Sequence, residues 1–267
     1  MTPERALALF ARVGYAARGI VYLLVGGLAA LAAFGQGGQT KGSKGALTQL
    51  LTAPMGEVLL GALALGLTGY SLWRCIQAIT DTDHHGNGPK GLAIRTGLAV
   101  SAVTHILLAV FAVRLIVTLG GSGSNNGGSK GAASWLMSQP YGRWMVGAVG
   151  LIMIGVGIAH GIKGARAQFA DHFDMPPRTQ RWAYPICRFG LMIRGLVFMV
   201  VGTFFIIAGY NVNPDEAGGI AEVFDTFRKQ PFGMWLMAFV AAGLFAFGAY
   251  SMLEAFYRRV DPSSGTD

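Results

Sequence analysis

The chain has 267 residues, of which 52% are hydrophobic and 13% are charged, whereas roughly a quarter of the residues in an ordinary soluble domain are charged. This composition excludes an ordinary water-soluble enzyme and predicts an all-α protein that crosses a membrane several times. The formal net charge of +8 then indicates an orientation in the membrane rather than nucleic-acid binding.

Six apolar stretches are long enough to span a bilayer, at residues 14–34, 57–78, 96–118, 143–163, 189–209 and 232–255. Lys and Arg are unevenly distributed over the segments that connect them: fourteen fall on the side of the two termini and six on the other side. Because positive charge collects on the cytoplasmic side, we expect both termini to be cytoplasmic. The two cysteines, Cys75 and Cys187, lie near cytoplasmic ends of these stretches and predict no disulfide.

The six stretches follow an internal repeat. Each outward helix opens with Arg-x-Gly and each return helix with Pro-x-Gly, at Arg12, Arg95 and Arg188 and at Pro54, Pro140 and Pro231. Such periodicity predicts three copies of one helical hairpin, related by a pseudo-threefold axis. The predicted hairpins cover residues 1–80, 95–164 and 187–257, joined by cytoplasmic linkers at 81–94 and 165–186 and followed by a polar tail at 258–267.

Each return helix is preceded by a short amphipathic segment, "SKGALTQLLTAPMG", "SKGAASWLMSQPYG" or "GGIAEVFDTFRKQPFG". Their apolar residues have helical spacing, so we expect three short interfacial helices on the outer surface. The proline should occupy the first turn of the returning helix, where its missing N–H would have no intrahelical partner.

The resemblance to a known family is carried by Arg12-x-Gly14-Tyr15-x-x-Arg18-Gly19, by Arg188-x-Gly190-x-x-x-Arg194-Gly195, by the Pro-x-Gly triplets, and by Asp81-x-Asp83 leading to Lys90-Gly91 and Arg95. In these motifs the chain resembles the bacterial integral membrane family called domain of unknown function 1206. The resemblance implies three tandem two-helix repeats in a bacterial inner membrane, and it implies no activity. Copy two departs from the pattern, with Ser101 in the place of the arginine.

A stripe of residues four apart lies on each outward helix: Gly14, Arg18, Tyr22 and Gly26; Gly97, Ser101, His105 and Ala109; Gly190, Arg194, Phe198 and Gly202. Small residues around a polar group are typical of a helix-packing face, so the stripes should face protein, where a neighbouring backbone can accept from the arginine.

The return helices add a second polar set at matching distances from their prolines: Arg74, His160 and Ser251, then Gln77, Lys163 and Glu254. Glu254 is the only acidic residue expected in this layer, and pairing with Arg18 or Arg194 would recover part of the cost of burying it. Two interpretations of the layer are open. The arginines either stabilise the fold by capping neighbouring helices, or bind an anion or lipid headgroup in the inner leaflet.

Histidine and aspartate residues offer weaker alternatives. His105 is expected to be a packed, hydrogen-bonded neutral imidazole, and a haem held by His105 and His160 is disfavoured because the two differ in depth. A divalent metal between the linkers is a weak possibility at Asp81, Asp83, His84, His85, Asp171 and His172. These residues lack tight ligand spacing, so we expect solvated linkers and neither a cofactor nor a metal.

No nucleophile-and-base pattern or phosphate-binding glycine motif occurs, so an enzyme is the least supported class. We therefore expect a non-catalytic binding or accessory protein that contacts anionic membrane lipid, a partner membrane complex or a second copy of itself through the inner-leaflet arginine layer. The alternative is a transporter or channel for small solutes or ions, with a polar path on the pseudo-threefold axis.

Overall fold

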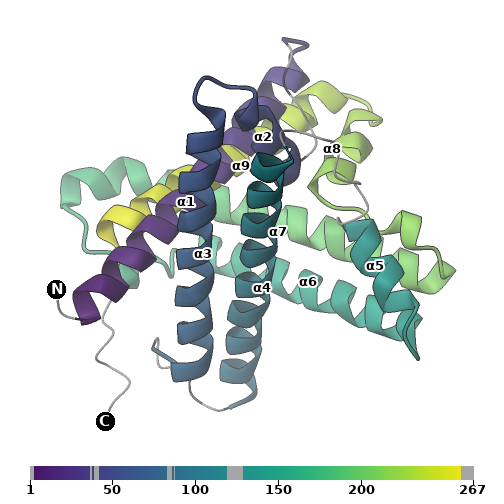
Figure 1. The fold of residues 1–267 in the computed structure, drawn as a ribbon, viewed down its shortest axis with the longest axis horizontal. Helices are drawn as coiled ribbons and strands as arrows, with labels where there is room; N and C mark the ends of the chain where they lie inside the picture. The colour runs from purple at the N-terminus through teal and green to yellow at the C-terminus, as the bar shows by residue number, and fades with distance from the viewer. Residues whose placement is uncertain are drawn as a thin grey trace.

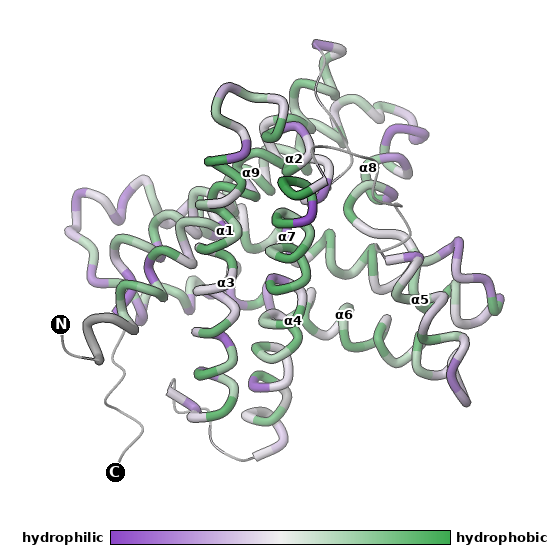
Figure 2. Tube along the Cα trace, viewed as in Figure 1, coloured by the Kyte–Doolittle hydropathy of each residue, from purple (hydrophilic) through white to green (hydrophobic). Residues whose placement is uncertain are grey.

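The computed structural model describes residues 3–36, 38, 42–82, 86, 88–118 and 129–259. Six long helices are present: α1 (Pro3–Ala33), α3 (Gly56–Thr80), α4 (Pro89–Val117), α6 (Gly142–Ala165), α7 (Pro177–Asn211) and α9 (Gly233–Tyr257). All six are long and apolar enough to cross a membrane, which confirms the predicted class of multi-pass helical membrane protein. Hydrophobic residues cover most of these helices, and hydrophilic residues gather mainly at their ends and in the turns (Figure 2).

Three short helices precede the return helices as predicted: α2 (Gly42–Leu51), α5 (Ser129–Met137) and α8 (Ile220–Arg228). Two single 3-10 turns, η2 (Ala170–His172) and η3 (Pro214–Glu216), complete the helical elements of the described residues. Lys44 of α2 is partly buried over the Phe111 ring, with 5.1 Å between its ammonium and the ring centroid. This burial lowers the pKa of the Lys44 ammonium.

The Pro-x-Gly motif forms the turn between each short helix and its return helix. The middle residue is left-handed in all three copies, with φ of 58° at Met55, 61° at Tyr141 and 61° at Phe232. The glycine then begins the helix, and a Cβ on Gly56 would lie 2.3 Å from the carbonyl oxygen of Leu51. The expectation that proline sits in the first helical turn is therefore wrong, because the chain must first reverse direction through a left-handed residue.

The most extensive helix contacts join successive repeats: α3 packs on α4, α6 on α7, and α9 returns to α1. Backbones meet at matching positions, since a Cβ on Gly195 would lie 2.5 Å from the Gly157 oxygen and one on Gly19 would lie 3.1 Å from the Gly248 oxygen. In the α3–α4 pair, Ser71 occupies that place and donates to the Ala102 carbonyl at 2.8 Å. The closest packing unit is thus a pair of helices from two repeats and not the hairpin itself.

The expected threefold arrangement is open on one side. Within repeats one and three the two long helices also pack together, with Gly14 against the Tyr70 backbone and Gly190 against the Phe247 backbone. The equivalent Gly97 on α4 has no atom within 4 Å of an added Cβ, and no extensive contact joins α4 to α6 in the described part of the chain. Repeat two is therefore splayed.

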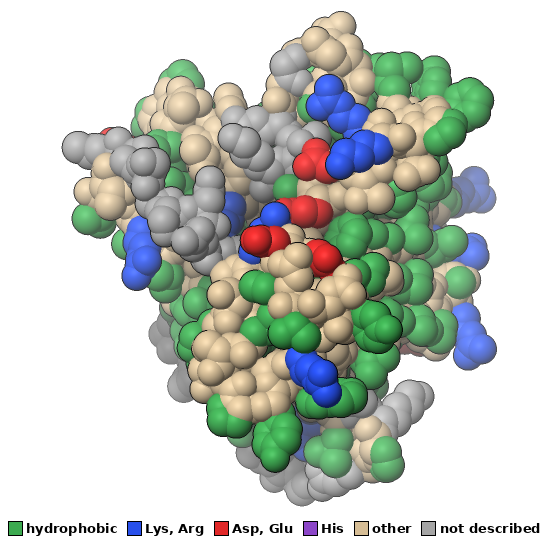
Figure 3. Space-filling view, turned by 90° about the vertical axis from the view of Figure 1, so that its right-hand side faces the viewer, with side chains coloured by type: hydrophobic (Ala, Val, Ile, Leu, Met, Phe, Trp, Pro, Cys, Tyr) green, Lys and Arg blue, Asp and Glu red, His purple; other side chains and the backbone are tan. Residues whose placement is uncertain are grey.

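The ends of the helices separate into two groups. The start of α1, the end of α9 and the turn after α6 lie toward the left of Figure 1 and the end of α3 lies at its bottom, whereas α2, α5 and α8 lie along its top and right. We call these the linker side and the short-helix side. The pairs diverge between them, because α3 and α4 run down the picture while α6 and α7 run across it. The face that carries α5 and α8 shows acidic side chains gathered near its centre (Figure 3).

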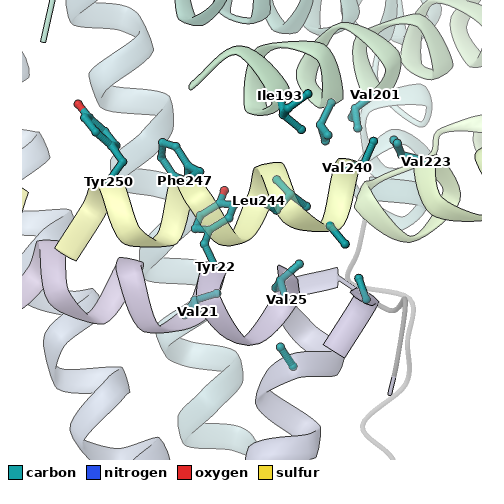
Figure 4. Packing of buried hydrophobic residues seen from close by; sticks show 14 of the residues in the cluster. Val21, Tyr22, Val25, Ile193, Val201, Val223, Val240, Leu244, Phe247 and Tyr250 are labelled. Carbon is teal, nitrogen blue, oxygen red and sulfur yellow. The ribbon is translucent and has the colours of Figure 1, made fainter. Parts of the chain in front are cut away.

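The hydrophobic core lies between α1, α7 and α9 (Figure 4). Tyr22 extends from α1 toward α9, where its ring lies 4.8 Å from that of Phe247. At the short-helix side, α8 covers the core with Val223 and Phe224, which are fully buried, along with a third apolar residue, Phe227.

Candidate functional site

Glu254, in the last turns of α9, is the centre of a buried polar network. One carboxylate oxygen accepts from the Tyr250 hydroxyl at 2.9 Å and from the Arg258 guanidinium at 2.8 Å. The other oxygen accepts from Arg18, forming the ion pair that charge pairing predicted. The side chain of Glu254 is only 1% exposed, so this carboxylate is held in place by two cations and a hydroxyl.

Each of the three guanidinium nitrogens of Arg18, on α1, donates a hydrogen bond to a side chain. Its Nε donates to the Ser251 hydroxyl at 3.0 Å, and its terminal nitrogens donate to the Tyr70 hydroxyl and to Glu254. The ring of Tyr70 also lies 4.8 Å from the guanidinium carbon. The expectation that a neighbouring backbone would accept from this arginine is wrong, because side chains of α3 and α9 accept instead.

Arg74 extends the network along α3. Its Nε donates to the Tyr70 hydroxyl at 2.7 Å, and a terminal nitrogen donates to the Gln77 amide oxygen at 3.1 Å. Tyr15 is fully buried beside it, accepts from the Trp73 indole at 3.1 Å and lies under three guanidinium groups, those of Arg18, Arg74 and Arg258. Cation–π contacts with aromatic rings therefore also stabilise these guanidinium groups.

Arg194, on α7, is equally buried but differently bound. Its guanidinium carbon lies 5.0 Å from the Tyr22 ring, 5.0 Å from the Phe198 ring and 4.1 Å from the Phe247 ring. Unlike Arg18, it makes neither a hydrogen bond nor an ion pair with any residue that the structure describes, and its Nε is buried without an acceptor. Glu254 therefore neutralises one of the two repeated arginines.

The repeat register explains this difference. At the positions where Arg18 meets Tyr70, Ser251 and Glu254, the matching residues of the next helices for Arg194 are Phe247, His160 and Lys163. In the second site a phenyl ring replaces the Tyr70 hydroxyl, an imidazole replaces the Ser251 hydroxyl, and an ammonium replaces the Glu254 carboxylate. Phe247 and Lys163 thus cannot accept, and the His160 imidazole, which keeps an acceptor in Nε2, forms no hydrogen bond with Arg194.

The two intramembrane histidines both bond to their own helices. His105 is 8% exposed, its Nδ1 donates to the Ser101 carbonyl at 2.7 Å, and its ring lies 4.6 Å from that of Tyr70. The Nδ1 of His160 donates to the Val156 carbonyl at 2.9 Å. Since a carbonyl can only accept, each imidazole carries its proton on Nδ1.

The linker residues considered for a metal are dispersed or lie outside the described residues, as Asp83, His84 and His85 do. Asp81 ends α3 and accepts from the Gly86 amide at 2.7 Å, which is a turn interaction. Asp171 and His172 lie in η2, and the His172 carbonyl accepts from the Arg259 amide at 3.0 Å. No group of three ligating side chains forms in the part of the chain that the structure covers.

A cavity of about 270 Å³ lies against Arg194. It is lined mostly by apolar groups, and its residues come from α1, α5, α6, α7, α8 and α9: Tyr22, Ser129, Met153, Arg194, Val197, Phe198, Val201, Phe205, Gly219, Ile220 and Leu244. Tyr22 and Leu244 point into this region from α1 and α9 (Figure 4). The cavity therefore joins a buried cation to an apolar space.

Sequence reasoning missed several members of the network, above all Arg258, which it assigned to the polar tail. The spacing of Tyr250, Glu254 and Arg258 at i, i+4 and i+8 was the available signal, because it puts all three on one helix face. It also missed the role of the opening arginines. Arg95 donates to the Ala78 and Ile79 carbonyls, and Arg188 donates to the Ala165 carbonyl, so these residues bond to the carbonyl end of the preceding return helix.

Comparison with known proteins agrees with the threefold register. Three segments, residues 13–81, 96–167 and 189–258, match the family described as Domain of Unknown Function (DUF1206). The chain belongs to this family. The third family match ends at Arg258, the residue that completes the Glu254 network.

One relative is a protein of Bacillus subtilis (strain 168) described as "Uncharacterized protein YxxB". It is 32% identical over 257 residues, which cover 94% of this chain and 91% of the relative. No solved structure matches the chain. The shared features therefore concern the repeat architecture, which the structure confirms.

Proposed function

We propose that this protein is a non-catalytic binding protein for anionic lipid in the bacterial inner membrane, with both termini cytoplasmic. The observation that carries the proposal is the imbalance of charge in the polar layer. Arg18, Arg194 and Arg258 are buried, and Arg74 and Lys163 are partly buried, whereas Glu254 is the one buried carboxylate among the described residues. Uncompensated charge is costly within a membrane, so an external anion would stabilise this layer.

Anionic lipid is the partner favoured by the position of this layer. It lies near the linker-side ends of α3 and α9, the side on which Lys and Arg predominate in the sequence. Cytoplasmic leaflets present anionic headgroups, which attract such clusters of basic residues. The acidic side chains of α8 and η3 belong to the other side, where they would not compete for the headgroup.

The transport alternative lacks a comparable observation. The rings of Tyr22, Phe198 and Phe247 stack on Arg194, and Tyr22 and Phe247 also meet edge to face with 4.8 Å between centroids. These rings occupy the space that a polar path along the axis would need. Solute or ion flux into proteoliposomes that depends on the protein would favour transport instead.

Native mass spectrometry of protein released from nanodiscs of equal phosphatidylglycerol and phosphatidylcholine tests the proposal. We expect retained lipid to be enriched in phosphatidylglycerol, and Lys163→Gln combined with Arg194→Gln to reduce the enrichment. Arg228→Gln, on the short-helix side, is the matched control and should leave it unchanged. Equal retention of both lipids by the wild-type protein would refute the proposal.

A further inference from the structure

We infer that the cavity beside Arg194 is a binding site for a single-chain fatty acid, whose carboxylate pairs with the Arg194 guanidinium and whose chain fills the apolar space. This inference rests on the proposed function and specifies its ligand. It assigns the two buried arginines different roles: Arg18 is saturated by the protein, and Arg194 is available to a ligand.

The aromatic rings around Arg194 leave its N–H groups without hydrogen-bond acceptors. A ring face attracts the positive charge of a guanidinium, but it offers no oxygen or nitrogen lone pair to the N–H groups. Arg194 is 8% exposed, lines the cavity and has no acceptor among the described residues. A carboxylate, like a phosphate, presents two oxygens that match a pair of parallel N–H groups, and its single charge balances the single cation of the lining.

Tyr22 supplies a second polar group at the same place. Its side chain lines the cavity and is 9% exposed, and its hydroxyl forms no hydrogen bond with a described residue. Because the guanidinium of Arg194 lies 5.0 Å from this ring, the phenol and the guanidinium converge on one end of the cavity. A few convergent polar groups in an otherwise apolar pocket are typical of small-ligand sites.

The remaining lining fits one acyl chain. Along α7 it includes Val197, Val201 and Phe205, so the cavity follows the helix from Arg194 for about 16 Å at 1.5 Å per residue. Its far end is lined by Ser129 and by Gly219 on the short-helix side, and Arg194 is the only cation of the lining. A volume of about 270 Å³ is slightly below the usual range for ligand pockets of roughly 300–1,000 Å³, which favours one chain over two.

The protein should remain folded when this site is empty or altered. Cation–π contacts with three rings offset part of the cost of placing an arginine inside a membrane. The rings can therefore hold Arg194 in the absence of a ligand. An Arg194→Gln variant removes a charge that no described carboxylate balances, so we expect it to fold.

The test measures binding of laurate to the full chain in phosphatidylcholine nanodiscs by isothermal titration calorimetry. We expect Arg194→Gln to weaken binding at least tenfold, because the ion pair is lost. Val201→Phe keeps the charge but fills the cavity, and should weaken binding similarly. The matched control is Arg181→Gln, an exposed arginine on the same helix, and it should bind laurate as the wild type does.

Two further ligands distinguish the contribution of the carboxylate to binding from that of the acyl chain. Dodecanol has the same chain without the carboxylate and should compete poorly, while lysophosphatidate presents a phosphate on a single chain. Equal laurate affinity of wild type and Arg194→Gln, equal competition by dodecanol, or preference for lysophosphatidate would each overturn the carboxylate site. If Arg194→Gln does not fold, tight binding of laurate by folded Val201→Phe overturns it equally. Selective retention of phosphatidylglycerol without laurate binding would refute this inference but not the proposed function. If the protein neither retains phosphatidylglycerol selectively nor binds laurate, both the inference and the proposed function are refuted.

Discussion

Replacing Glu254 by Gln should be among the most destabilising polar substitutions in this protein. The change keeps the size of the side chain and its ability to accept from Tyr250, but removes the charge that faces Arg18 and Arg258. Both cations are more than 90% buried, and Glu254 forms an ion pair with each of them. Removal of one partner of a buried ion pair typically costs about 3–5 kcal/mol, and we expect a loss of unfolding free energy in that range.

The measurement is the unfolding free energy in mixed micelles, followed by tryptophan fluorescence during titration with a denaturing detergent. The control is Glu57→Gln in the first turn of α3, where the carboxylate is exposed, and its effect should stay within about 0.5 kcal/mol. Combining Arg18→Gln with Glu254→Gln should be less damaging than the sum of the two single changes, with a coupling energy of about 0.5–3 kcal/mol. Additive effects, or a Glu254→Gln variant as stable as Glu57→Gln, would show that the ion pair is not what stabilises this layer.

Three further predictions concern the helix contacts. Gly190→Ala should sharply reduce folded yield because the new Cβ would lie 2.4 Å from the Phe247 nitrogen, whereas Gly97→Ala, at the matching position of repeat two, should be neutral; size-exclusion chromatography measures both. Tyr70→Phe removes an oxygen that accepts from two arginines and should cost about 1–3 kcal/mol in the same detergent titration, unless water replaces it. Arg95→Gln should increase hydrogen exchange at the end of α3, where its guanidinium holds two carbonyls, and unchanged exchange there would contradict the capping role.

The number of long helices and the threefold register were predictable because each depends on local sequence. Hydropathy gives the spans, and the spacing of the Arg-x-Gly and Pro-x-Gly motifs gives their equivalence. The pairing of helices across repeats was not predictable in this way. The chain joins α6 to α4 as well as to α7, and only the packed structure, with Gly157 against Gly195, shows which of the two α6 contacts. The open side at Gly97 was not predictable either, because it depends on how α4 and α6 diverge.

The candidate site was predictable where charge alone determines the contact. A single acidic residue among several cations had to pair with a nearby arginine, and Glu254 pairs with one of the two expected, Arg18. The contribution of Tyr70 could not be read from the sequence, because its hydroxyl accepts from arginines on α1 and α3 only once these helices are packed. Whether Arg194 had a partner was equally undetermined before the register of α6 and α7 was known.

The contrast between the two arginines argues against a purely structural role for both. If each served only to hold helices together, the repeat would need acceptors at both sites, since an unpaired buried donor costs about 1–3 kcal/mol. Around Arg18 these acceptors are present, yet the same register around Arg194 offers Phe247, His160 and Lys163. The third of these cannot accept a hydrogen bond, whereas Glu254 accepts one from Arg18. Because the cavity opens on the same guanidinium, the proposed binding of an anion would account for both the unpaired donors of Arg194 and the unfilled space.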